Sequence, residues 1–122
     1  MIVDETQLAK SLIFIATGTV DIILLRRYIP ALEKLELVCW TRLGYALCEP
    51  AVIQFVKERF NKVLDSFLAM TLKHNIYHKE DLTYLFSLLD VEELVEYLVH
   101  NEPIVREAAK ARFDQLSKVL EI

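Results

Sequence analysis

The sequence has few of the residues that build tight turns and phosphate-binding loops. Only two glycines, Gly18 and Gly44, and three prolines occur among its 122 residues. Nucleotide-binding loops depend on closely spaced glycines, so P-loop and dinucleotide-fold signatures are excluded, as is a glycine-flanked nucleophile elbow. Tight hairpin turns should be scarce, and the composition suits long helices joined by short connections.

Cysteine is also scarce. Cys39 and Cys48 lie nine residues apart, which matches neither a disulfide framework nor a metal-binding spacing. Both fall at apolar positions of one expected helix, so we interpret them as small buried hydrophobic residues. A reducing cytosol fits this interpretation, and we predict a cytoplasmic protein.

The chain lacks an excess of positive charge. Its net charge is −4, which disfavours general nucleic-acid binding because that function usually shows a basic footprint. The first residues lack the basic region of a signal peptide. The most apolar stretch, Leu12 to Leu25, is too short to span a bilayer and contains Asp21. We therefore expect no membrane association.

Apolar residues, by contrast, are abundant. They make up 54 % of the chain, above the usual share of about 45–50 %. A domain of this size has a limited interior, so some apolar surface should remain outside its core. That surface favours a protein partner or a homo-oligomer.

Apolar spacing predicts a single all-α domain over residues 1–122, with six or seven helices. The spacing allows either a compact bundle or two stacked repeat-like units of about three helices. No strand-like alternation persists. The expected helices cover residues 5–17, 20–28, 30–47, 50–73, 82–89, 91–99 and 103–120.

Several helix ends carry capping signals. Asp4 should cap the first helix, with Gln7 answering it and Val3 packing on Leu8. Gly18 suits the position after its last turn. Thr19 should cap the second helix. Asp90 and Glu93 form a second capping box.

One signature occurs twice, 53 residues apart. The pattern E-P-x-V-x-x-x-x-K-x-R-F begins at Glu49 and again at Glu102. In both copies proline can open a helix, because its missing N–H costs nothing in the first turn. An internal repeat of residues 11–63 and 64–116 would explain the pattern, and so would independent selection of the same helix features.

The second copy resembles a known family. The segment Asn101-Glu102-Pro103-Ile104-Val105-Arg106-Glu107-Ala108-Ala109, with Leu116 beyond it, is similar to the second helix of HEAT-type repeats. Leu94 to Val99 looks like the first helix of such a repeat, so the resemblance lies mainly in residues 91–120. It implies helix-pair packing and a partner-binding role without chemistry. The first copy departs from the family pattern at Ile53, Phe55 and Val56.

Two groups of residues have metal-ligand spacing. His74 and His78 would share a helix face if the helix continued there, and Glu92, Glu96 and His100 share another. A metal site would need the two groups to meet, so we interpret them as loop histidines and a solvated acidic face. We expect no metal, no cofactor and no enzymatic activity.

The remaining candidates suggest two functions. The first is a non-enzymatic interaction module or small scaffold that self-associates through the flanks of the helices over 30–47 and 50–73. Its contact residues would be Leu37, Trp40, Tyr45 and Phe55. The alternative is a helical subunit that contacts nucleic acid within a larger ribonucleoprotein or regulatory complex. It would use the basic residues Arg26, Arg27, Lys57, Arg59 and Lys62.

Overall fold

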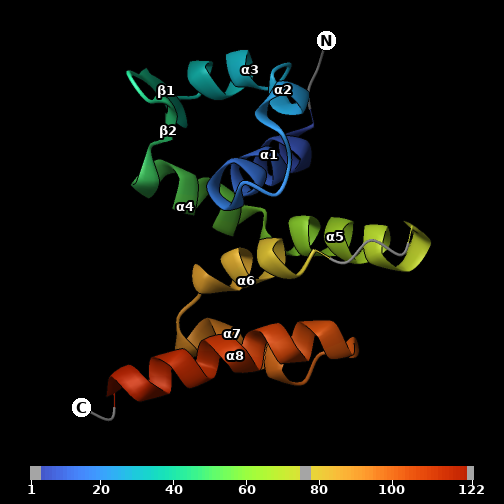
Figure 1. The fold of residues 1–122 in the computed structure, drawn as a ribbon. Helices are drawn as coiled ribbons and strands as arrows, with labels where there is room; N and C mark the ends of the chain where they lie inside the picture. Colours follow the sequence, from blue (N-terminus) through green and yellow to red (C-terminus); the bar gives the residue numbers. More distant parts are fainter. Residues whose placement is uncertain (1–3, 75–77, 121–122) are drawn as a thin grey trace.

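The computed structural model describes residues 4–74 and 78–120, in which eight helices and one β-hairpin follow one another (Figure 1). The predicted helical character is confirmed, and the hairpin is an addition to it. The elements are α1 (Glu5–Thr17), α2 (Ile22–Leu25), α3 (Ile29–Lys34), β1 (Val38–Thr41), β2 (Gly44–Leu47), α4 (Glu49–Glu58), α5 (Phe60–His74), α6 (Lys79–Ser87), α7 (Val91–Leu98) and α8 (Pro103–Leu120).

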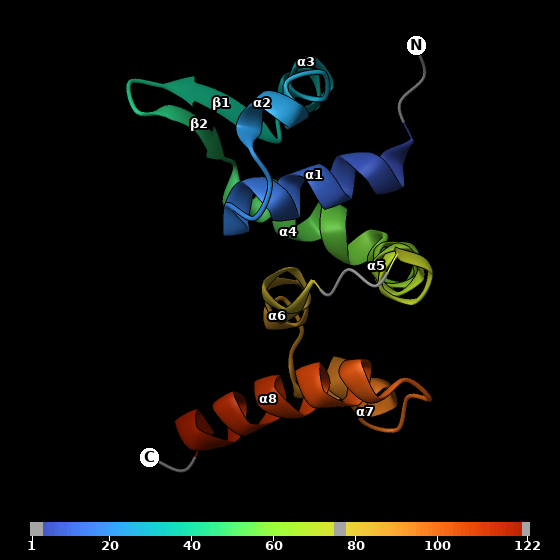
Figure 2. The same ribbon diagram turned by 45° about the vertical axis from the view of Figure 1, so that its right-hand side comes forward.

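The helices stack from one end of the molecule to the other. α1 packs against α4, α5 and α6, and α8 packs against α6 and α7. α2, α3 and the hairpin lie at one end, whereas α7 and α8 lie at the opposite end (Figures 1 and 2).

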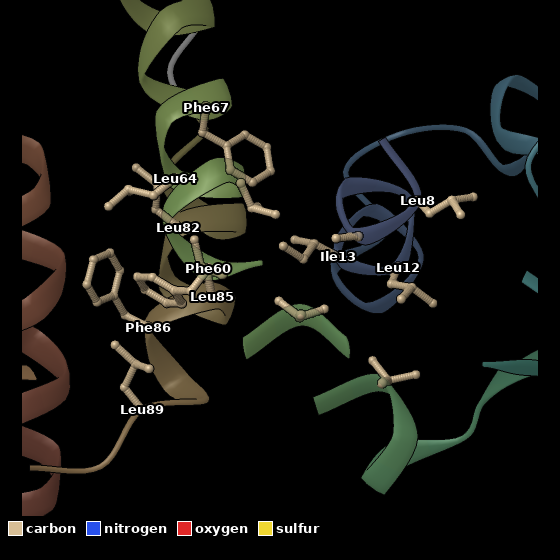
Figure 3. Packing of buried hydrophobic residues seen from close by; sticks show 14 of the residues in the cluster. Leu8, Leu12, Ile13, Phe60, Leu64, Phe67, Leu82, Leu85, Phe86 and Leu89 are labelled. Atoms are coloured by element: carbon tan, nitrogen blue, oxygen red, sulfur yellow. The ribbon is translucent and has the colours of Figure 1, made fainter. Parts of the chain in front are cut away.

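The core forms where α1, α5 and α6 meet. Ile13 of α1 and Phe67 of α5 point into the space between their helices, and Phe86 of α6 points toward α8 (Figure 3). Phe14 of α1 meets Phe67 of α5 edge to face, with ring centroids 5.8 Å apart. Such pairs add stabilisation beyond the area that they bury. The residues labelled there are Leu8, Leu12, Ile13, Phe60, Leu64, Phe67, Leu82, Leu85, Phe86 and Leu89.

The predicted cap and end of α1 and the predicted capping box of α7 are confirmed, but among the described residues the Gln7 side chain does not answer Asp4 with a hydrogen bond. The Asp4 carboxylate accepts a hydrogen bond from the Thr6 N–H at 2.7 Å. Gly18 follows α1 with φ of 68°, and its N–H donates to the Phe14 carbonyl. Asp90 and Glu93 form the expected reciprocal box. The predicted contact of Val3 with Leu8 lies outside the described residues.

The second helix is shorter than predicted and starts later. α2 has four residues and is capped by Asp21, whose carboxylate accepts from the Ile23 N–H at 2.8 Å. Thr19 was expected in that role. Its hydroxyl instead donates to the buried Asp81 carboxylate, and this contact holds the loop outside the helix.

The predicted helix over 30–47 is wrong. α3 ends at Lys34, Glu36 follows with a positive φ of 60°, and the chain continues into the hairpin. Val38 pairs with Leu47 and Trp40 pairs with Tyr45. Gly44 follows the turn with φ of 118°, a conformation that glycine adopts readily and other residues rarely do.

The hairpin also moves the cysteines out of the expected helix. Cys39 is exposed on β1, and Cys48 is half-buried just before α4. Desolvation raises the pKa of the Cys48 thiol, and the nearby Cys39 thiol and Glu36 carboxylate raise it further. Cys39 is therefore not the buried residue that we predicted.

The helix predicted over 50–73 is two helices. Arg59, with φ of −113° and ψ of 16°, separates α4 from α5. The break lets both segments bury their apolar stripes: Val52 and Val56 in α4, and Val63 and Phe67 in α5. A helix that turns around a core in this way needs such an interruption.

Both Glu-Pro pairs open helices, as predicted, at the starts of α4 and α8. The residues between them do not share one structure. An offset of 53 places β1 against the start of α7, so it pairs a strand with a helix.

Tyr97 of α7 provides a test of this packing. Its ring is buried, and its hydroxyl donates to Asn61 Oδ1 at 2.6 Å. Burial, followed by the Glu96 and Glu93 carboxylates, raises the pKa of Tyr97 to about 12. A tyrosine in an unfolded chain ionises at about pH 10. The stabilisation of the fold by the neutral, buried phenol is therefore fully present below that pH. The contribution is then lost as the pH rises toward 12.

We expect Tyr97→Phe to lower the free energy of unfolding by about 1 kcal/mol at pH 7. It should also lose less stability than the wild type between about pH 10 and pH 12. Urea unfolding across this range measures both effects. Parallel losses in the two proteins would contradict the buried phenol as their cause.

Candidate protein-interaction surface

An apolar groove opens between α2 and the β-hairpin. Its volume is about 660 Å³. The ends of α1 and α3 complete its walls. The residues that line it are Ile15, Ile22, Ile23, Arg26, Ile29, Trp40, Leu43, Gly44 and Tyr45.

The hairpin supplies the aromatic wall of the groove. Side chains alternate across a strand, so Val38 and Trp40 share one face of β1. Val38 is buried in the core, but Trp40 lies farther toward the tip and is 70 % exposed. The Trp40 and Tyr45 rings pack edge to face across the strands, with centroids 4.9 Å apart. Leu43 at the turn is fully exposed.

The other wall comes from α2, whose four residues are all apolar. Such a short helix can turn only one side toward the core, and only Leu25 is buried. Ile23 is 72 % exposed and Leu24 is 68 % exposed. A helix that is apolar all round belongs in a core or in an interface, and α2 lies on the surface.

Positive charge lies beside this apolar surface. Arg26 lines the groove and also a neighbouring hollow formed with Ile23, Leu24 and Arg27. The Arg27 guanidinium lies 4.9 Å from the centroid of the Tyr28 ring. Arg42 is exposed at the hairpin turn. The groove can therefore take an apolar ligand surface that carries negative charge at its edge.

The structure brings together only two of the four residues predicted to contact a partner. Trp40 and Tyr45 are paired across the hairpin in the groove, and do not lie on a helix over 30–47 as we expected. Leu37 is a buried core residue, which leaves little of it for a partner. Phe55 lies on α4, and the Arg59 guanidinium lies over the Phe55 ring, 3.8 Å from the ring centroid. Phe55 is not part of the groove.

The predicted basic residues are dispersed, and two of them are held by carboxylates. Lys57 pairs with Glu93 at 2.8 Å. Arg59 pairs with Glu5 at 2.9 Å and with Glu58 at 3.3 Å. Lys62 is exposed on α5, whereas Arg26 and Arg27 lie near the groove.

A second cluster of polar side chains lies inside the fold, around Asp81 of α6. This carboxylate is buried and accepts from the Thr17 hydroxyl at 2.8 Å and the Thr19 hydroxyl at 2.7 Å. His78 Nδ1 lies 2.9 Å from its other oxygen. Among the described residues, His78 Nε2 has no hydrogen-bond partner. The cluster ties the end of α1 to the start of α6.

Lys10 of α1 belongs to the same polar interior. Its ammonium donates to Ser66 Oγ at 3.0 Å and lies 5.5 Å from the centroid of the Phe67 ring. Burial lowers the pKa of Lys10, and the Asp81 carboxylate partly opposes that shift. These polar side chains pair with one another inside the fold, so we interpret the cluster as structural.

The predicted metal-ligand groups do not meet in the described structure. His78 pairs with Asp81, and His100 Nδ1 accepts from the Glu102 N–H at 3.0 Å. The side chain of His74 lies outside the described residues. Over residues 4–74 and 78–120, no three His, Cys, Asp or Glu side chains are grouped so that they could hold a metal ion.

None of the helices in the part of the chain that the structure describes combines the length and the apolar character needed to cross a lipid bilayer.

Known proteins offer no direct guide to the groove. No protein-family model, no curated protein and no solved structure matches this chain significantly.

Proposed function

We propose that this chain is a non-enzymatic protein-interaction module that self-associates through the groove between α2 and the hairpin. One observation carries the proposal. Nine large apolar side chains are exposed in the described part of the chain, and six of them lie between Ile22 and Leu43. A concentration of exposed apolar groups of this kind marks an interaction site, whereas single ones are ordinary.

The chemistry of the groove supports the same proposal. Trp and Tyr are the residues that most often dominate binding energy, because each buries a large rigid surface. Trp40 and Tyr45 lie next to each other here, and Arg26 adds a charged group at the same site. A two-stranded hairpin gains little stability alone, so contact at its tip would stabilise it.

The opposite end of the molecule supports a scaffold role. α7 and α8 are joined by four residues, so they pack as a neighbouring pair of the kind that HEAT repeats stack. The Arg106 guanidinium donates to the His100 and Asn101 carbonyls and fixes this connection. We propose that this pair is a HEAT-like unit that presents a surface.

A nucleic-acid ligand is the second candidate, and one observation favours it. Arg26 and the exposed Trp40 line the same groove, and an aromatic ring beside a guanidinium can hold a base and its phosphate. Lys57 and Arg59, however, are paired with carboxylates elsewhere on the molecule. The cations predicted for this role do not form one basic surface, so we favour a protein partner.

Self-association can be followed through Trp40, which is the only tryptophan in the chain. We expect the apparent mass to rise with protein concentration in light scattering, and the Trp40 emission to shift to shorter wavelength as the ring becomes buried. Ile23→Asp should suppress both changes, because it places a charge on the apolar wall of the groove.

Leu72→Asp is the matched control. Leu72 is 69 % exposed on α5, much as Ile23 is on α2, and it is not a groove residue. Association should survive this change. If the wild type stays monomeric at every concentration with unshifted emission, self-association is wrong. Salt-dependent binding of a single-stranded oligonucleotide by that monomer would then support the second candidate.

A further inference from the structure

The outer face of α7 combines apolar and acidic side chains. The helix buries Leu94 and Tyr97 on its inner side. On the outer side, Val95 is 59 % exposed and Val99, just after the helix, is 79 % exposed. They are four residues apart, so they lie one above the other on the same face. A helix face that is exposed only to water usually carries polar residues, not two valines, at such positions.

Carboxylates flank these two valines. Glu92 and Glu96 are exposed at positions that share the face with Val95 and Val99. The outer face of α7 is therefore an apolar stripe with an acidic border.

The groove has the opposite charge. Arg26 lines it, Arg27 lies beside it, and Arg42 is exposed at the hairpin turn. Asp21 is the acidic residue at the start of α2, and its carboxylate already accepts the Ile23 N–H. An apolar groove with a basic border matches an apolar stripe with an acidic border, and such complementarity sets partner choice and orientation.

The two surfaces lie at opposite ends of one chain. α2 and the hairpin form one end, and α7 lies at the other, beyond α6 (Figures 1 and 2). They cannot meet within a single molecule as it is folded here. A second copy can bring them together.

We propose that the outer face of α7 in one copy docks into the groove between α2 and the hairpin of the next copy, head to tail. This inference rests on the proposed self-association and specifies its two surfaces. Each contact leaves one groove and one α7 face free, so copies add in sequence and form a closed ring or an open filament.

Two variants with complementary defects test the arrangement. Ile23→Asp disables the groove and leaves the α7 face intact. Val95→Lys places a cation on the α7 face and leaves the groove intact. Both positions are exposed, so both variants should fold. Each alone should associate roughly tenfold or more weakly than the wild type. Mixed, they should form a one-to-one complex that grows no further, seen by analytical ultracentrifugation.

Each result decides between the two proposals. If Val95→Lys alone still associates as the wild type does while Ile23→Asp does not, the head-to-tail contact is overturned and the groove remains the site of self-association. If the two variants stay monomeric when mixed, the head-to-tail contact is also overturned. If the wild type itself does not associate, self-association through the groove fails with it. A mixture of Leu72→Asp and Val95→Lys is the control for charge effects, because it carries the same two charge changes. Leu72→Asp keeps both docking surfaces, so this mixture should grow beyond a one-to-one complex.

Discussion

Replacing Asp81 by alanine is expected to lower the free energy of unfolding by about 3–5 kcal/mol. The buried carboxylate accepts from Thr17 and Thr19 and contacts His78. It also opposes the cost of burying the Lys10 ammonium. Alanine would leave these groups without their partner inside the fold, and stranded buried polar groups carry a desolvation penalty. Urea or guanidinium unfolding at neutral pH measures the loss.

Two variants make the Asp81 experiment specific. Asp81→Asn keeps an oxygen that Thr17 and Thr19 can donate to and removes only the charge, so its loss should be smaller. Asp21→Ala removes an exposed capping carboxylate from α2 and should cost about 1 kcal/mol. An Asp81→Ala loss no greater than that of Asp21→Ala would show that the buried network does not stabilise the fold.

Local signals explain which helices could be predicted from the sequence. Asp4 and Gly18 bound α1, the box of Asp90 and Glu93 opens α7, and prolines mark the starts of α4 and α8. These signals work because a helix end must satisfy its own backbone groups within a few residues. The break at Arg59 carries no such signal. It follows from the position of α1, against which both halves pack.

The hairpin was missed because its apolar residues also fit a helix. Leu32, Leu35, Cys39, Leu43 and Leu47 recur at spacings of three and four, yet Leu35 and Leu43 are exposed in the structure. A competing signal was present. The run Val38 to Thr41 is β-branched or aromatic at three of four positions, and Gly44 follows it after two intervening residues. That order is typical of a hairpin.

Trp40 is exposed, as a contact residue has to be, but its neighbours in the groove could not be predicted from the sequence. The groove requires α2 and the hairpin to lie side by side, and neither element was fully predicted. The polar network around Asp81 was inaccessible for a similar reason. Thr17 and Asp81 lie 64 residues apart, and only the packing of α1 on α6 brings them together.

Phe86→Ala should have the other large effect, a loss of about 3–5 kcal/mol of unfolding free energy. The Phe86 ring is fully buried on α6 and packs against two other rings. Its centroid is 5.3 Å from that of Phe60 and 5.4 Å from that of Tyr97. Phe60 and Tyr97 are themselves 5.0 Å apart. Truncation would open a cavity at the point where α5, α6 and α7 meet.

Phe86→Leu is the matched control, because it keeps an apolar side chain of similar reach and should cost about 1.5 kcal/mol or less. Thermal and urea unfolding of the two variants measure the difference, and equal losses would contradict a cavity as the cause.

Phe86→Leu also separates folding from assembly. It alters neither the groove nor the outer face of α7, so it should self-associate as the wild type does. Since the three rings join α7 to the rest of the fold, Phe86→Ala should loosen α7 and weaken head-to-tail association even where the groove is intact.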